Sequence, residues 1–179
     1  MVQFHPCPPI IMTITPHLLA GAALATTTSN VFVAFLLGFL LHFVLDAIPH
    51  IDPGTFHNIK IPGYEKKINL ETVHADDKPW PNWLYTFVII EFIVSWTVVI
   101  LLFHQRSDFP NIVFGGLGAI AVDVFDNPLF RFALKWPIFK QIHWLHHRFH
   151  HNLPSEKWYW GLPAVIIISG VSLWYLLRF

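Results

Sequence analysis

The chain has 179 residues, of which 54% are hydrophobic and only 12% charged, and its mean hydropathy is +0.51. This composition is far from that of water-soluble domains and indicates one integral membrane domain, residues 1–179. Acidic and basic residues balance at 11 each, so nucleic acid is not an expected partner. The single cysteine, Cys7, excludes an internal disulfide framework and a zinc site built from cysteines, which leaves histidine and carboxylate ligands.

Five apolar runs predict an all-α polytopic membrane bundle of about five transmembrane or membrane-embedded helices. Ahead of them lies a proline-rich lead-in, in which Met1 and Met12 both remain possible starts. The third and fifth runs, at about 20 residues, are long enough to cross ~30 Å of hydrocarbon. The first and fourth are shorter, so we expect them to be tilted, extended by their flanks, or packed against protein. The runs cover residues 16–30, 31–48, 83–103, 112–126 and 159–177.

The two short runs are rich in small residues, which let helix backbones approach closely in a bilayer. Two tight helix pairs are therefore expected. Thr15 and Pro16 suit the start of the first helix, with Thr15 as its cap. The small residues are Gly21, Ala22, Ala23 and Ala25 in the first run and Gly115, Gly116, Gly118, Ala119 and Ala121 in the fourth.

Lysine and arginine in the connections predict the orientation, because positively charged loops stay in the cytoplasm. The connections 49–82 and 127–158 contain nine of these residues, whereas the other side holds only Arg106 and Arg178. We therefore predict that the N-terminus and both long loops are cytoplasmic and that the C-terminus lies outside. The same topology brings eleven of the twelve histidines to the cytoplasmic side or within a few turns of it; His104 lies opposite.

The second apolar run ends in a ladder of possible metal ligands. His42, Asp46 and His50 are four residues apart and share one helix face. Ionisable groups in an apolar helix are costly unless they are paired or bind a cation, which makes them functional candidates. Pro49 would end the helix and let His50 and Asp52 turn back over the site. A divalent-cation site is the favoured interpretation, and a structural His42–Asp46 hydrogen bond is the alternative.

Three further carboxylates lie within apolar runs. Asp123 and Asp126 are three residues apart and can face one cation or its bound water, or instead cap the helix or pair with Arg131. Glu91 lies ~12 Å into the third run. For Glu91 the roles of metal ligand, general base and internal salt-bridge partner all remain open.

A second concentration of histidines follows in residues 141–151. On a helix, His143, His147 and His151 would form one stripe, with His146 on the adjacent one. Interleaved aromatic residues make the segment amphipathic, so it also suits an interfacial helix on an anionic leaflet. We expect at least one of these histidines to contact metal or a substrate phosphate, with His147 and Arg148 facing an anionic headgroup.

The start of the chain resembles a known family. The segments Thr15-Pro16-His17-Leu18-Leu19-Ala20-Gly21 and Gly38-Phe-Leu-Leu-His42-Phe-Val-Leu-Asp46-Ala-Ile-Pro-His50-Ile-Asp52 are similar to those of the small bacterial membrane-bound predicted metal-dependent hydrolases. The likeness ends at about residue 55, with a weaker echo from Gly118 to Pro128. It implies a bacterial inner-membrane location. It also implies five metal-site residues: His17, His42, Asp46, His50 and Asp52.

A competing resemblance is to the membrane fatty-acid hydroxylases and sterol desaturases, whose di-iron centres use histidine boxes. His143-x-x-His146-His147 and His147-x-x-His150-His151 are similar to such a box. Those enzymes spread about eight histidines over three separated boxes, whereas this chain has one doubled box and a mixed His/Asp ladder. A third possibility is a non-enzymatic membrane subunit or scaffold, since the chain contains no nucleophile triad, P-loop or dinucleotide motif.

Together these patterns predict a metal-dependent hydrolase acting on a lipid or lipid-linked ester or phosphoester at the cytoplasmic face. A divalent cation would activate water, with zinc first and manganese or iron as alternatives. The expected partners are membrane lipids and a lipid-like substrate, and a place in a larger membrane complex remains open. The predicted metal residues are His17, His42, Asp46, His50, Asp52, His143, His146 and His147; the predicted catalytic residues are Asp46, Asp123, Asp126 and Glu91; the predicted substrate contacts are His147 and Arg148.

Overall fold

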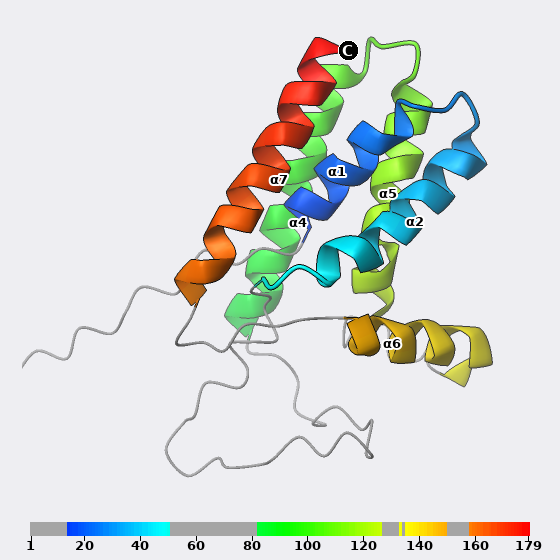
Figure 1. Ribbon diagram of the computed structural model, residues 1–179, viewed down its shortest axis with the longest axis vertical. Helices are drawn as coiled ribbons and strands as arrows, with labels where there is room; N and C mark the ends of the chain where they lie inside the picture. Colours follow the sequence, from blue (N-terminus) through cyan, green and yellow to red (C-terminus); the bar gives the residue numbers. More distant parts are fainter. Residues whose placement is uncertain (1–13, 51–81, 127–132, 134, 150–157) are drawn as a thin grey trace, which may run out of the picture.

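The computed structural model describes residues 14–50, 82–126, 133, 135–149 and 158–179. In that part of the chain every regular element is an α-helix, which confirms the all-α prediction. In Figure 1, α6 lies across one end of a bundle formed by the other helices. The helices are α1 (Thr15–Ala25), α2 (Val31–Asp46), α4 (Asn82–Phe103), α5 (Phe109–Asp126), α6 (Pro137–Phe149) and α7 (Trp158–Arg178).

Each of the five predicted runs contains a helix, but the first ends at Ala25 rather than at residue 30. The hydroxyl groups of Thr26 and Thr27 donate to carbonyls one turn back, which suits the end of a helix. Asn30 then begins α2, because its side-chain oxygen accepts hydrogen bonds from the first backbone N–H groups of that helix. The predicted loop 127–158 contains α6, and residues 51–81 of the loop 49–82 lie outside the described part.

α1 is the innermost helix of the bundle. Nearly all of its residues are buried, because α2, α5 and α7 pack around it. At ~1.5 Å per residue its length is only ~16 Å, about half the thickness of a bilayer's hydrocarbon core. The short first run therefore packs against protein, one of the outcomes expected for it.

Small residues bring α1, α2 and α5 together. A Cβ atom added to Gly21 would lie 2.5 Å from the Cβ of Ala119 and 2.5 Å from the carbonyl oxygen of Gly115. Added to Gly38 or Gly118, it would collide with a backbone carbonyl of the facing helix. The sequence predicted two tight helix pairs, but the structure joins three helices at one contact region, since α5 offers small residues to both α1 and α2.

A side chain from α4 caps the start of α1. Glu91 Oε1 accepts hydrogen bonds from the backbone N–H of Ile14 at 3.1 Å, and from the N–H and the hydroxyl of Thr15, both at 3.0 Å. The N-cap position is Ile14, which makes no side-chain cap hydrogen bond, so the prediction of Thr15 as cap is wrong. The carboxylate of Glu91 supplies the missing acceptor and also complements the positive end of the helix dipole.

Long apolar stripes face outward on three helices. Two segments are long and apolar enough to cross a membrane, Tyr85–Phe103 in α4 and Trp160–Arg178 in α7. Large contiguous apolar surfaces on a protein mark contact with membrane or with another protein. The exposed stripes include Leu36, Leu40 and Val44 on α2, Ile89, Ile93 and Leu101 on α4, and Ile166, Ile167 and Val171 on α7.

At the other end of the bundle, the turn between α4 and α5 is tied to its neighbours. Arg106 donates to both carboxylate oxygens of Asp108, at 2.8 and 2.7 Å, and to the carbonyl of Leu176 at 2.6 Å. The hydrogen bonds from Arg106 hold the pKa of Asp108 below its usual value. The Asn111 side chain donates to the carbonyl of Thr28 at 2.7 Å, which joins this turn to the one between α1 and α2.

Candidate metal centre

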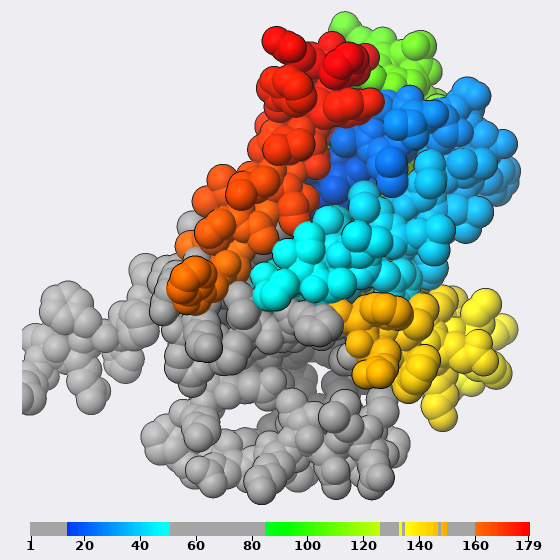
Figure 2. All heavy atoms as spheres, in the orientation of Figure 1, coloured from blue at the N-terminus to red at the C-terminus, as the bar shows by residue number. Residues whose placement is uncertain are grey.

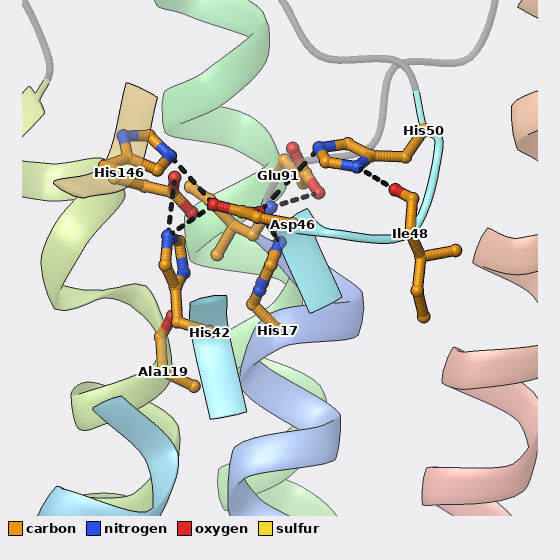
Figure 3. A network of polar contacts seen from close by, with 10 residues as sticks. His17, His42, Asp46, Ile48, His50, Glu91, Ala119 and His146 are labelled. Atoms are coloured by element: carbon orange, nitrogen blue, oxygen red, sulfur yellow. Dashed lines mark hydrogen bonds and ion pairs between the residues drawn. The ribbon is translucent and has the colours of Figure 1, made fainter. Parts of the chain in front are cut away.

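Polar side chains from four helices meet at one buried point, at the end of the bundle where α6 lies (Figure 3). Each helix brings its ligands from a position near its end, so the meeting point depends on how the helices pack. The residues are His17 on α1, His42 and Asp46 on α2, Asp123 on α5 and His146 on α6, with His50 just beyond α2.

Asp46 lies at the centre of this cluster, with its side chain only 1% exposed. Its Oδ2 lies 2.9 Å from Nε2 of His42 and 2.9 Å from Nε2 of His146. Its Oδ1 lies 3.3 Å from Nε2 of His17 and 3.8 Å from Nε2 of His50. One buried carboxylate is therefore surrounded by four imidazole groups.

The His42–Asp46–His50 ladder forms in two different ways. His42 and Asp46 are one turn apart on α2, as their spacing predicts. α2 ends at Asp46, so His50 is no longer on the helix, and the chain after it turns the imidazole back toward the carboxylate. The backbone carbonyl of Ile48 holds this ring, with its oxygen 2.7 Å from Nδ1 of His50.

Backbone carbonyls fix the tautomers of two of these rings. Nδ1 of His42 lies 2.8 Å from the carbonyl oxygen of Ala119, and Nδ1 of His50 has a similar contact with Ile48. A carbonyl only accepts, so the Nδ1 atoms carry hydrogen and a neutral ring presents a lone pair at Nε2. Metal-bound histidines show this arrangement, because the other ring N–H is usually held by a carbonyl or a carboxylate.

The contacts at the centre of the cluster require a positive charge between the imidazole nitrogens and the carboxylate. Nε2 of His42 and both carboxylate oxygens of Asp46 are buried, with no hydrogen bond of acceptable geometry among the described residues. An imidazole lone pair and a carboxylate oxygen 2.9 Å apart repel each other unless a cation or a second ring proton lies between them. The donor set therefore fits a bound metal ion.

Two groups of described residues have the ligand atoms to hold a metal ion, namely His17, His42 and Asp123, and His42, Asp46 and His146. In each group these atoms lie within 4.8 Å of one another. Zinc bonds of ~2.0–2.1 Å place tetrahedral ligands roughly 3.3 Å apart. The ion-pair distances in the cluster, 2.9 to 3.8 Å, bracket that value. Both groups use His42, whose Nδ1 is engaged by Ala119, so its Nε2 can serve one ion at a time.

Other predicted site residues lie elsewhere or outside the described part. His143 is buried on α6 but belongs to neither metal group, and Arg148 is exposed on the same helix. Glu91 caps α1, as described above. Asp52 lies outside the described residues, as do the side chains of Asp126 and His147, so their predicted roles stay predictions.

Sequence reasoning missed three contributions to the site. The carbonyls of Ala119 and Ile48 orient histidines, and no residue type signals such a role because every residue has a carbonyl. Glu91 caps α1, the helix that carries His17, and the sequence did contain a sign of this role. α1 has no acidic residue in its first turn, so its N–H groups need an acceptor from another element.

The fold and the cluster define a class: an α-helical protein with two candidate membrane spans and a buried His/Asp centre suited to a metal ion. No protein-family model, curated protein or solved structure matches the chain.

Proposed function

We propose that this chain is a polytopic membrane protein whose His/Asp cluster binds one divalent cation and hydrolyses a lipid or lipid-linked ester or phosphoester. The observation that carries the proposal is the contact between the buried carboxylate of Asp46 and the Nε2 atoms of His42 and His146, both at 2.9 Å. The proposed family is that of the membrane-bound predicted metal-dependent hydrolases, on the motifs around His17 and His42.

The outward apolar stripes support a membrane location. In the proposed arrangement α4 and α7 span the bilayer, and α2 and α5 extend through most of it, since 16 and 18 residues correspond to ~24 and ~27 Å. α1 is embedded in the membrane and surrounded by α2, α5 and α7. The excess of lysine and arginine in the two long loops supports a cytoplasmic position for the cluster. The proposed family supports a bacterial inner membrane.

α6 suits a helix that lies at the membrane surface. Its inner side carries the buried His143 and His146, whereas Trp144 is 61% exposed and Lys140 and Arg148 are also exposed. Tryptophan and cationic side chains together favour the headgroup region. In the proposal Arg148, with His147, contacts an anionic headgroup of the substrate.

Within the site, the proposed ligands are one of the two groups, His42, Asp46 and His146, with His17 and His50 close to the carboxylate of Asp46. A bound divalent cation, with zinc the first expectation, would supply Lewis-acid chemistry there, lowering the pKa of water and polarising the ester or phosphoryl oxygen. Asp123 is the carboxylate best placed to orient that water and accept its proton, because its Oδ1 lies 3.8 Å from Nε2 of His42 and its side chain is 22% exposed. Asp46 is enclosed by imidazoles and suits the role of ligand.

The deciding experiment is the metal content of the full chain purified in detergent, measured by mass spectrometry. We expect close to one zinc or manganese ion per chain in the wild type, and its loss in His42→Ala and Asp46→Asn. His104→Ala is the matched control, since His104 is exposed at the far end of α4 and belongs to neither metal group. Circular dichroism and gel filtration show whether each variant is folded.

The outcomes separate the three candidate functions. A folded wild type without metal contradicts the hydrolase proposal and favours a structural membrane subunit held together by protonated His–Asp pairs. Two irons per chain favour the di-iron hydroxylase. If the wild type binds one ion, Asp123→Asn should retain that ion and lose hydrolysis in a screen of esters and phosphoesters. An Asp123→Asn protein that hydrolyses as the wild type does would contradict the role proposed for Asp123.

A further inference from the structure

The helix α6 is attached to the bundle by few buried side chains. Of its side chains that the structure describes, only His143 and His146 are buried, whereas Phe139, Ile142 and Leu145 are half-buried and the others are exposed. Figure 2 shows α6, in gold and yellow, projecting from the end of the bundle. An isolated helix of 13 residues is only marginally stable in water, so the order of α6 depends on what it packs against.

Two aromatic contacts among the described residues join α6 to the bundle. The ring centroid of Phe139 lies 4.7 Å from that of Phe125 on α5, and the ring centroid of Phe149 lies 6.4 Å from that of Phe43 on α2. Phe149 is nevertheless 44% exposed. Between the two contacts along the helix lies His146, the α6 residue that reaches the buried carboxylate at the centre of the cluster. A polar contact therefore lies in the middle of the α6 interface.

The two possible metal groups differ in whether they include α6. One group joins α2 to α6 through His42, Asp46 and His146. The other lies on α1, α2 and α5 and consists of His17, His42 and Asp123. An ion in the first group would bond to both helices at once, so its binding free energy would add to the docking of α6. An ion in the second group would make no bond to α6.

We propose that α6 is an ion-dependent cover, which docks over the centre when a divalent cation joins His146 to His42 and Asp46. The inference rests on the proposed function, which supplies the cation, and it adds a regulation of that site. α6 also carries His147 and Arg148, the proposed headgroup contacts. Only the ion-loaded protein then has its substrate-binding helix in place, and loss of the ion releases α6 and opens the end of the bundle.

The test is amide hydrogen exchange of the full chain in detergent at about pH 8, where a free imidazole is largely neutral. Protein stripped with EDTA is compared with protein given zinc at about ten times its dissociation constant, for which linkage predicts about tenfold slower exchange in α6. The amides of α5, which packs against α1 and α2, serve as the internal reference and should exchange alike in both samples. Equal exchange of α6 with and without zinc would overturn the proposal.

Two histidine variants of α6 form a matched pair. Each removes one buried imidazole, but only His146 belongs to a metal group. His143→Ala should keep the slowing of α6 exchange by zinc, whereas His146→Ala should lose it. Slowing by zinc in His146→Ala, or its loss in both variants, contradicts a connection through His146. Leu145→Cys in a Cys7→Ser background gives a second measurement, since this half-buried position should react faster with a maleimide after zinc is removed.

Metal content separates this inference from the proposed function. A wild type that binds zinc without a change in α6 exchange removes the cover and leaves the metal site intact. A wild type whose α6 responds to zinc but which hydrolyses none of the esters and phosphoesters screened keeps the cover and removes the hydrolase. A folded wild type that binds no metal contradicts both.

Discussion

Two carboxylates within apolar helices, Asp46 and Glu91, are stabilised in different ways. Burying an ionised carboxylate without partners costs several kcal/mol or more. Glu91 receives three hydrogen bonds from the start of α1, so its charge is matched by backbone and hydroxyl donors. Asp46 is surrounded by imidazole nitrogens, two of which belong to rings whose Nδ1 is held by a carbonyl. Glu91 therefore has a structural role on the contacts alone, whereas Asp46 has the surroundings of a metal ligand.

Substitution of Glu91 tests that distinction. We expect Glu91→Leu to lower the free energy of unfolding by about 3 kcal/mol, because three donors lose their acceptor. Glu91→Gln retains a side-chain oxygen as acceptor and should cost only about 1 kcal/mol, the charge-assisted part of the hydrogen bonds. Urea titration in micelles, followed by tryptophan fluorescence, measures both.

The same variants test the catalytic role predicted from sequence. Glu91→Gln should retain the metal content and the hydrolytic activity of the wild type if capping is the whole role of this residue. A folded, metal-bound Glu91→Gln protein without activity would instead support a general base at this position.

At the residue scale, the sequence predicted the local part of the site and left the distant part open. His42 and Asp46 were paired correctly because one helical turn fixes their separation. The approach of His146 and Asp123 depends on where α6 and α5 lie, which spacing along the chain does not determine. The carbonyl of Ala119 reaches His42 only because small residues let α5 come close to α2, so this contact is a product of packing.

At the element scale, the contact among α1, α2 and α5 depends on glycine. Gly21, Gly38, Gly115 and Gly118 each face the backbone of a neighbouring helix, so even one methyl group would push the helices apart. We expect Gly38→Ala to lower the free energy of unfolding by about 1–3 kcal/mol through overpacking. It should also weaken the proposed metal binding, since α2 and α5 carry candidate ligands on both sides of the site. Thermal unfolding and metal content measure the two effects.

Gly170→Ala is the matched control for this prediction. Gly170 lies in α7 with open space around its Cβ position, so the methyl group meets no neighbour. Alanine is the better helix former by about 1 kcal/mol, so the control should be neutral or slightly stabilising. A Gly38→Ala protein as stable as the Gly170→Ala protein would show that α2 and α5 tolerate a wider separation.

The sequence analysis placed α6 in the loop 127–158, but it also considered an amphipathic interfacial helix for residues 141–151. The helix has 13 residues with several charges and histidines, too short and too polar to resemble a membrane span. Of the expected helical stripes, the described residues include the side chains of His143 and His146, and both are buried. The other histidine side chains of these stripes lie outside the described part. The contact between His146 and Asp46 could not be predicted from the sequence. It depends on α6 packing against the end of α2, and spacing along the chain does not determine that packing.

At the scale of the whole molecule, five of the six helices in the described part were predictable, but their arrangement was not. The length and apolar character of each run predicted five helices, α1, α2, α4, α5 and α7, close to their observed bounds. Which helix lies inside is decided by side-chain size and by mutual contacts, and α1 takes that place through its glycine and alanine residues. The connection 49–82 carries no apolar run, and residues 51–81 lie outside the described part of the chain.

The predicted orientation of the molecule is open to a direct test. Alkaline phosphatase fused after Phe179 should be active in bacteria, because the enzyme folds only outside the cytoplasm, and a green fluorescent protein at the same position should stay dark. Fusions ending within residues 127–158 should show the reverse pattern. A fluorescent fusion after Phe179 would invert the topology and place the His/Asp centre at the outer face.

The enclosure of α1 has a consequence for how the protein is made. This helix is synthesised before α5 and α7, yet those two helices form much of the wall around it. In the proposed membrane arrangement, a helix of ~16 Å would not be held across the hydrocarbon by its own length while it waits. α1 would then remain near the membrane surface, or rest provisionally against α2, until the later helices arrive. Assembly would run against chain order, since the helix that carries His17 would reach its place only when most of the protein has left the ribosome.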